Sequence, residues 1–114
     1  MNSFDSSAFT WLTIPDLVEE LGVSQSYVRR LLEDNVLAGM RIDGIFKVPS
    51  DFLVEGEPLA SLQGTIVLLR DCGFSSDDAV QWLLEEEESL GVSPVAALTA
   101  GRKAEVRRVA QALL

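Results

Sequence analysis

Apolar residues in the first third of the chain recur at the spacing of two short helices joined by a tight turn. Leu17, Val18 and Leu21 follow a 3.6-residue period, and Gly22 can adopt the positive φ that ends a helix. Further along, apolar residues stand at i, i+1, i+4 and i+5, which places them in one stripe on a second helix: Tyr27, Val28, Leu31 and Leu32. The pattern predicts a helix-turn-helix between residues 13 and 34.

The polar residues at the starts of both segments are of the kind that caps helices. Thr13 is followed three residues later by Asp16, an arrangement like a capping box in which Asp replaces the usual Glu. Pro15 stands in the first turn, where its missing N–H costs little. Ser24 stands where it can cap the second helix. We therefore expect the helices to begin directly after Thr13 and Ser24.

Two short apolar runs flank an Asp-Gly pair after the second helix. Asp43 and Gly44 favour a type I′ turn, which needs positive φ at both central residues. Each run carries one basic residue, Arg41 in the first and Lys47 in the second. A helix-turn-helix followed by such a hairpin is a winged helix-turn-helix, here expected over residues 11–54.

The rest of the sequence completes the prediction of a mainly α protein. Apolar residues keep helical spacing after the winged helix. We therefore expect residues 59–114 to form a helical C-terminal domain, a bundle that packs on the winged helix-turn-helix. Residues 55–58 are interpreted as a short polar joint. Residues 1–10 contain Asn, Asp and three Ser among scattered apolar groups, which is typical of a flexible N-terminal tail.

Composition excludes several kinds of site. The chain has one cysteine, Cys72, and no histidine, so no intramolecular disulfide, no Cys/His metal site and no histidine general base can form. Four consecutive glutamates, residues 85–88, would spread around a helix rather than converge on a metal ion. No phosphate-binding loop or nucleophile elbow is present. We expect no enzyme activity, no cofactor and no metal.

Hydropathy bears on where the protein works. No apolar run approaches the roughly 20 residues that a membrane-spanning helix needs. The first ten residues lack the basic start and apolar core of a signal peptide. We therefore expect a cytoplasmic protein that has no membrane contact.

The charge of the chain gives two opposing signals. A net charge of −9 argues against binding to nucleic acid, because non-specific affinity comes from neutralising phosphates. Residues 1–54, however, hold four basic residues against eight acidic ones, and all four basic residues stand in the second helix or in the segment just after it. This clustering favours a local basic surface.

The polar residues outside the apolar stripe of the second helix suit a DNA major groove. Arg can bind guanine O6 and N7, Gln can bind adenine N6 and N7, and Ser or a helix N-terminus can bind phosphate. The hairpin would reach a neighbouring groove or the phosphate backbone. Alternatively, Arg29 and Arg30 only solubilise an exposed face and pair with nearby Glu. The candidate DNA-binding residues are Ser24, Gln25, Ser26, Arg29, Arg30, Arg41 and Lys47.

The stretch LTIPDLVEELGVSQSYVRRLLEDNVLAGMRIDGIFKVP resembles the winged helix-turn-helix of excisionase and MerR-type DNA-binding domains, and the match covers roughly residues 11–53. The likeness rests on the LGVS turn, the R-R-L-L helix and the D-G wing. It looks closest to a family of small actinobacterial DNA-binding proteins that are substrates of a Ser/Thr protein kinase. The resemblance implies sequence-directed binding of double-stranded DNA, transcriptional regulation and a kinase partner. Thr10 is the candidate phosphorylation site, although exposed Ser and Thr are common in any tail.

The second half resembles the C-terminal domain of Xre/MbcA/ParS-type antitoxins in its order of W-L, L-G, S-P and A-L-x-x-G. In that family the domain contacts a toxin or helps to dimerise the antitoxin, so the resemblance implies a homodimer or a protein partner through the C-terminal helices. Any compact helical bundle would use the same residues for packing. Two hypotheses remain: a DNA-binding regulator, and a protein-interaction module of antitoxin or adaptor type whose acidic surface repels nucleic acid.

Overall fold

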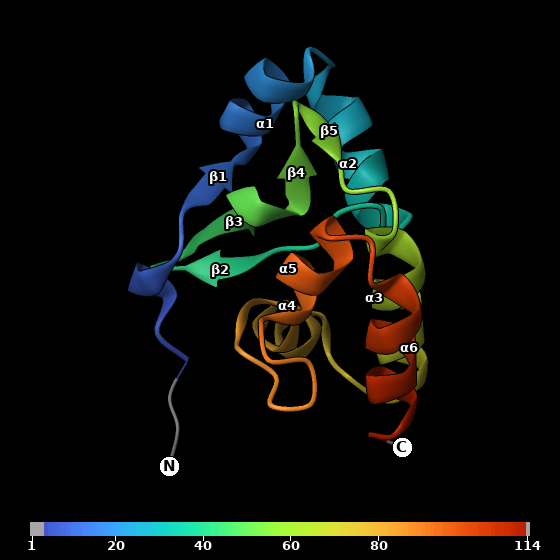
Figure 1. The fold of residues 1–114 in the computed structure, drawn as a ribbon. Helices are drawn as coiled ribbons and strands as arrows, with labels where there is room; N and C mark the ends of the chain where they lie inside the picture. Colours follow the sequence, from blue (N-terminus) through green and yellow to red (C-terminus); the bar gives the residue numbers. More distant parts are fainter. Residues whose placement is uncertain (1–3, 114) are drawn as a thin grey trace.

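The computed structural model describes residues 4–113 and confirms the expected class, mainly α with a winged helix-turn-helix followed by helices (Figure 1). The first three residues of the expected tail and residue 114 of the expected C-terminal domain lie outside the described residues. The elements are, in chain order, η1 (Ser6–Ala8), β1 (Trp11–Thr13), α1 (Ile14–Leu21), α2 (Gln25–Glu33), β2 (Met40–Ile42), β3 (Ile45–Pro49), η2 (Ser50–Phe52), β4 (Leu53–Val54), β5 (Glu57–Pro58), α3 (Leu62–Asp71), α4 (Ser76–Leu84), α5 (Pro94–Thr99) and α6 (Lys103–Gln111).

A three-stranded antiparallel sheet supports the helix-turn-helix. Its order is β1-β3-β2, so β3 is the central strand. The β2–β3 hairpin turns at Asp43 and Gly44, whose φ angles of 53° and 84° are those of the predicted type I′ turn. This hairpin is the expected wing.

Both helices begin where their capping residues predict. The Asp16 N–H donates to Thr13 Oγ1 at 3.3 Å, and the Asp16 carboxylate accepts from the Thr13 N–H at 2.9 Å, which completes the capping box. The backbone hydrogen bond from Thr13 is the main reason that the pKa of Asp16 lies below its ordinary value, and nearby Lys47 adds to the effect. In the second helix, the Tyr27 N–H donates to Ser24 Oγ at 3.1 Å.

One hydrophobic core runs through both halves of the chain. Leu17 of α1, Phe52 of η2 and Leu83 of α4 are fully buried members of a single cluster. The helix α4 packs against β2 and α5 packs against η2, below the sheet in the view of Figure 1. Gln63 Nε2 donates to the Asp34 carbonyl at 2.9 Å and joins α3 to the end of α2. Because the same cluster serves both halves, each half stabilises the other.

Residues 55–58, interpreted as a short polar joint, have regular structure. They complete a second hairpin in which β4 pairs with β5 and the turn falls at Glu55 and Gly56, with φ angles of 51° and 76°. This hairpin points toward α1 (Figure 1), where a Cβ on Gly56 would lie 3.4 Å from the Glu20 carbonyl oxygen. Strands of two residues are too short to show the alternation by which a strand is recognised in a sequence.

Residues 4–10 of the expected tail fold back on themselves. The rings of Phe4 and Phe9 stack with their centroids 5.6 Å apart, and Trp11 Nε1 donates to the Ser6 carbonyl at 2.8 Å. This local order arises because aromatic side chains in the segment can cover one another. The flexibility of the segment stays a prediction.

The four glutamates at residues 85–88 lie outside any helix, because α4 ends at Leu84. Glu85 adopts an extended conformation, and Glu87 forms an isolated bridge with Val92 that closes the loop. The helical interpretation of this run was therefore wrong. Among residues 4–113, no group of three or more acidic or cysteine side chains is placed to hold a metal ion. No helix in that range has the length and apolar character needed to cross a bilayer.

Candidate nucleic-acid interface

The helix α2 separates a buried face from an exposed polar face. Val28 is fully buried and Leu31 is 9% exposed, and both belong to the core cluster. The outer face carries the candidate base-contacting residues, all of them exposed: Gln25, Ser26, Arg29 and Arg30. The structure therefore brings these four side chains to one surface of a helix that starts directly after the tight turn at residues 22–24.

The two arginines of α2 are not held by carboxylates. Within the described part of the chain, the one salt bridge shorter than 4.0 Å joins Arg102 to Glu105, far from α2 in the sequence. Arg29 and Arg30 thus form no ion pair there with the nearby glutamates, and their guanidinium groups remain available to an external acceptor.

The first turn of α2 offers donors of its own. Ser24 is exposed and its hydroxyl oxygen accepts the capping hydrogen bond, so the hydroxyl proton remains free to donate. The helix dipole places positive potential at this end, which suits a phosphate oxygen.

The wing does not place its two basic residues on one face. Arg41 pairs with Phe46, and Lys47 pairs with Met40 on the next position of the ladder, so the two basic side chains leave opposite faces of the hairpin. Arg41 is exposed and its Nη1 donates to the Gly44 carbonyl at 3.0 Å, along the wing turn. If the hairpin enters a DNA groove edge-on, each of its two faces would lie toward one of the phosphate backbones that border the groove.

Tyr27 is a surface residue, although its spacing in the sequence predicted a place in the apolar stripe of the second helix. Its side chain is 49% exposed, and it borders a groove of ≈ 510 Å³ between α2 and the β4–β5 hairpin. Tyr27 stands three residues before Arg30, so the two side chains are neighbours on the helix surface. Val28, Leu31 and Leu32 are enough to form the apolar stripe of α2. The sequence therefore already allowed Tyr27 to be a surface residue.

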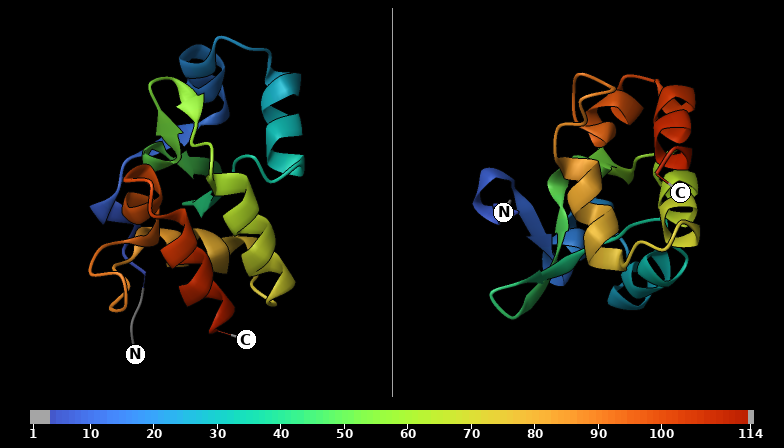
Figure 2. Two further views of the ribbon diagram at one scale, coloured as in Figure 1. Left: turned by 45° about the vertical axis from the view of Figure 1, so that its right-hand side comes forward. Right: turned by 90° about the horizontal axis from the view of Figure 1, so that it is seen from below.

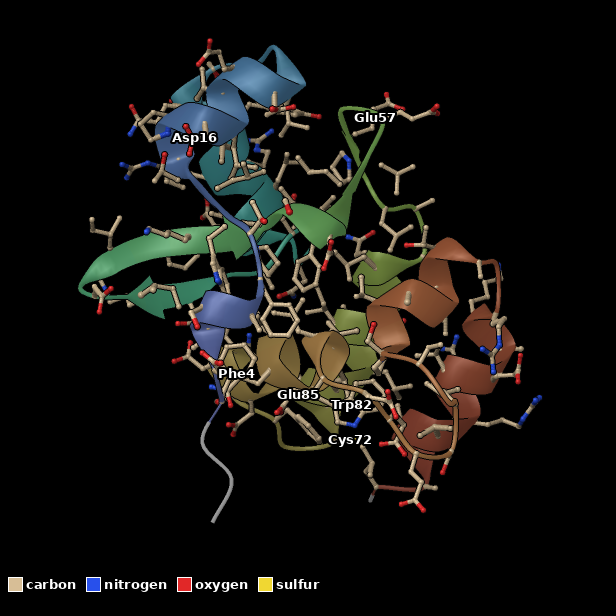
Figure 3. The ribbon with its side chains drawn as sticks, turned by 60° about the vertical axis from the view of Figure 1, so that its left-hand side comes forward. Phe4, Asp16, Glu57, Cys72, Trp82 and Glu85 are labelled. Atoms are coloured by element: carbon tan, nitrogen blue, oxygen red, sulfur yellow. The ribbon has the colours of Figure 1, made fainter. Side chains whose placement is uncertain are left out.

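Acidic side chains border this basic surface. Asp16, Glu19 and Glu20 line a shallow hollow on α1, and Glu57 lines the groove beside Tyr27. Figure 3 shows Asp16 and Glu57 at the same end of the molecule, on α1 and on the second hairpin. Because carboxylates repel phosphates, a duplex would have to approach along the basic residues of α2 and the wing, although exposed Glu33, Asp34 and Asp43 lie on these elements too.

Thr10 lies directly before β1, and its side chain is exposed. Its carbonyl accepts from the Ser50 N–H at 2.9 Å, which extends the pairing of β1 with the end of β3. The preceding segment lies beside the wing, because Phe4 and Ser6 line a hollow together with Arg41. A charge added at Thr10 would therefore stand next to the sheet that forms the wing.

Comparison with known proteins extends this picture to the whole chain. A family model described as "DNA-binding protein Rv2175c, wHTH domain" matches residues 5–53. A second, described as "Rv2175c C-terminal domain of unknown function", matches residues 59–114. The two models come from one protein and match the two halves of this chain in order.

A relative and a solved structure agree with the family models. The DNA-binding protein Rv2175c of Mycobacterium tuberculosis is 31% identical over an alignment of 113 positions, gaps included, and the match covers 88% of this chain and 77% of the relative. The NMR structure of Rv2175c matches with a TM-score of 0.87 at 28% identity and covers 98% of this chain and 86% of that one. The expected resemblance to an actinobacterial winged helix-turn-helix family is confirmed. This chain belongs to the family of the DNA-binding protein Rv2175c.

Proposed function

We propose that this protein binds double-stranded DNA in a sequence-directed way and regulates transcription in the cytoplasm. The observation that carries the proposal is the exposed outer face of α2, where Arg29 and Arg30 stand free of salt bridges within the described residues. The family supports it, because the relative is named a DNA-binding protein and the matching model is a winged helix-turn-helix domain.

In this proposal α2 lies in the major groove. Arg29 or Arg30 donates two hydrogen bonds to a guanine, and Gln25 reads a neighbouring adenine. Each such bidentate contact contributes roughly 1–3 kcal/mol of discrimination against the wrong base. Arg41 and Lys47 contact phosphates and fix the register of the protein on the duplex. The acidic side chains on α1 and the second hairpin keep the duplex on the α2 side.

The test is enrichment of duplexes from a random-sequence pool, at low and at near-physiological salt. We expect the wild-type chain to enrich one motif, and the double variant Arg29→Ala/Arg30→Ala to lose that enrichment. The matched control is Lys103→Ala/Arg107→Ala, which removes the same charge from α6, away from α2 and the wing (Figure 2). Equal enrichment by both double variants would overturn the proposal, and a folded wild type that enriches nothing would favour the protein-interaction module.

We also propose that a Ser/Thr kinase controls this binding through Thr10. A phosphate adds about −1.5 to −2 charge next to the sheet that forms the wing, and this charge would repel DNA phosphates that approach the wing. The test compares the chain carrying phospho-Thr10, made by semisynthesis, with the unmodified chain and with Thr10→Val on one duplex. We expect weaker binding of the phosphorylated chain alone, and equal affinity of all three proteins would contradict the proposal.

A further inference from the structure

A groove between α3 and α6 lies away from the surface assigned to DNA. In the right-hand view of Figure 2, α5 and α6 lie at one edge of the molecule, and the wing and α2 lie at the other. The groove has a volume of ≈ 580 Å³ and is bordered by the start of α3, by α6 and by Leu98 of α5. A partner bound here would leave α2 and the wing free.

The groove has an apolar floor and low walls. Leu68 of α3 and Leu98 of α5 contribute its apolar surface. Gly64 on α3 and Ala104 on α6 face it from the two helices, and a Cβ built on Gly64 would meet nothing within 4 Å. Small residues on both helices leave a channel into which side chains of a third helix can insert.

The rim of the groove is basic in an otherwise acidic half. Residues 55–114 contain five basic residues against ten acidic ones, yet Lys103 and Arg107 line the groove and no acidic side chain does. They stand one turn apart on α6, both exposed. The one salt bridge of residues 4–113 is Arg102–Glu105, so neither rim residue has a carboxylate within 4.0 Å there.

The beginning of α3 adds to this positive potential. Ser61 at its N-cap has helical φ and ψ and makes no side-chain capping hydrogen bond. The amides of the first turn therefore lack a side-chain acceptor beside the groove.

We propose that the α3–α6 groove is the docking surface for a partner protein that presents an acidic amphipathic helix. Its apolar side chains would fill the channel over Leu68 and Leu98, and its carboxylates would pair with Lys103 and Arg107. The positive charge of Lys103 and Arg107 favours an acidic partner. The apolar surface of Leu68 and Leu98 favours an amphipathic peptide segment over a nucleic-acid backbone, which has no apolar face to bury. The inference does not depend on the DNA proposal.

The glutamate run of a second copy of this chain is a poor occupant of the groove. Its longest acidic run, residues 85–88, lies in a loop rather than a helix, and the apolar residue that follows, Leu90, is buried in the core. That run therefore cannot present the apolar face that the floor of the groove requires.

The experiment titrates the ¹⁵N-labelled full chain with a synthetic helical peptide in which Leu recurs at i, i+3 and i+4 and the remaining positions are mainly Glu. We expect chemical-shift changes centred on the amides of Gly64, Thr65 and Ala104. Lys103→Ala/Arg107→Ala should weaken binding about three- to tenfold, since two exposed ion pairs are lost. Arg108→Ala removes one positive charge from the same helix at a residue that does not line the groove, and this control should bind like wild type.

A filled groove provides the second variant. A Cβ on Gly64 would meet no atom within 4 Å, and Leu is a better helix former than Gly, so we expect Gly64→Leu to keep the fold while its side chain blocks the channel. We expect this variant to lose peptide binding. Absent shifts, shifts centred elsewhere, equal binding of a scrambled peptide, or full binding by Gly64→Leu would each overturn the proposal. The same amide shifts on raising protein concentration alone, or on adding duplex DNA, would assign the groove to a second copy or to nucleic acid instead.

Discussion

At the scale of single residues, side chains on one side of α2 pack in the core, and side chains on the other side are exposed and available for binding. Val28 and Leu31 fill the core, while Arg29 and Arg30 stand between them in sequence and on the opposite side of the helix. Changing either arginine should therefore leave the fold intact. Tyr27 stands at the border, with its ring half-exposed beside the second hairpin.

Arg29→Ala and Arg30→Ala test base reading one residue at a time. If either side chain forms a bidentate contact to guanine, its loss should weaken binding by roughly 1–3 kcal/mol and relax discrimination at one base pair. Fluorescence anisotropy against a panel of single-base variants of the enriched motif measures both effects. A uniform loss over the whole panel would instead make that arginine a phosphate contact.

The capping box at the start of α1 gives a pH-dependent contribution to stability. The folded pKa of Asp16 lies below its ordinary value of 3.8, mainly because its carboxylate accepts a hydrogen bond from the Thr13 backbone. The contribution is therefore present above that ordinary value and is lost as pH falls through the folded pKa. Asp16→Asn should lower the urea midpoint of unfolding near neutral pH. The difference between the midpoints of the variant and the wild type should shrink at low pH, where Asp16 is protonated in the wild type.

The Thr13 side chain gives the complementary measurement. Thr13→Ala should lower the free energy of unfolding by about 0.5–2 kcal/mol, while Thr13→Ser, which keeps the hydroxyl, should cost much less. Equal loss in the Ala and Ser variants would show that the cap hydroxyl contributes nothing.

At the scale of elements, the wing carries one basic residue on each of its two faces. Because these residues are expected to contact phosphates, their contribution to binding should not depend on the DNA sequence. Arg41→Ala and Lys47→Ala should each weaken all duplexes alike and reduce the salt slope by about one unit. Affinity measured at several salt concentrations on the motif and on an unrelated duplex tests this. A change confined to the motif would place the residue on a base instead.

Elements with strong local signals could be predicted from the sequence, and elements defined by distant contacts could not. Thr13, Ser24 and the Asp43–Gly44 turn each act through their own backbone surroundings, so their patterns predicted the helix starts and the wing. The second hairpin has strands of two residues, and its position against α1 depends on tertiary contact. The opposite faces of Arg41 and Lys47, in contrast, follow from the register that a two-residue turn at Asp43 and Gly44 fixes, so this feature of the wing could be derived from the sequence.

At the scale of the whole molecule, a shared core fixes two surfaces in relation to each other. The helices α4 and α5 pack against β2 and η2, and α6, which carries the basic rim of the α3–α6 groove, lies at the edge of the molecule opposite the wing (Figure 2). If both proposals hold, one chain could bind a partner in the groove and a duplex on α2 at the same time, because the shared core joins the two surfaces. The domain of unknown function would then connect a DNA site to a second protein.

The salt dependence of DNA binding reports how many copies of the protein chain bind one DNA site. Arg29, Arg30, Arg41 and Lys47 are the only basic residues of the first half, so even if all four met phosphates, one chain would give a slope no steeper than roughly −3.6. Binding by one chain should then be weak near physiological salt, since the surrounding carboxylates add repulsion. A slope clearly steeper than this on a short duplex with one motif would contradict binding by a single chain. On a duplex with two motifs it would instead indicate two chains side by side, and the slope should return to the single-chain value when one motif is scrambled.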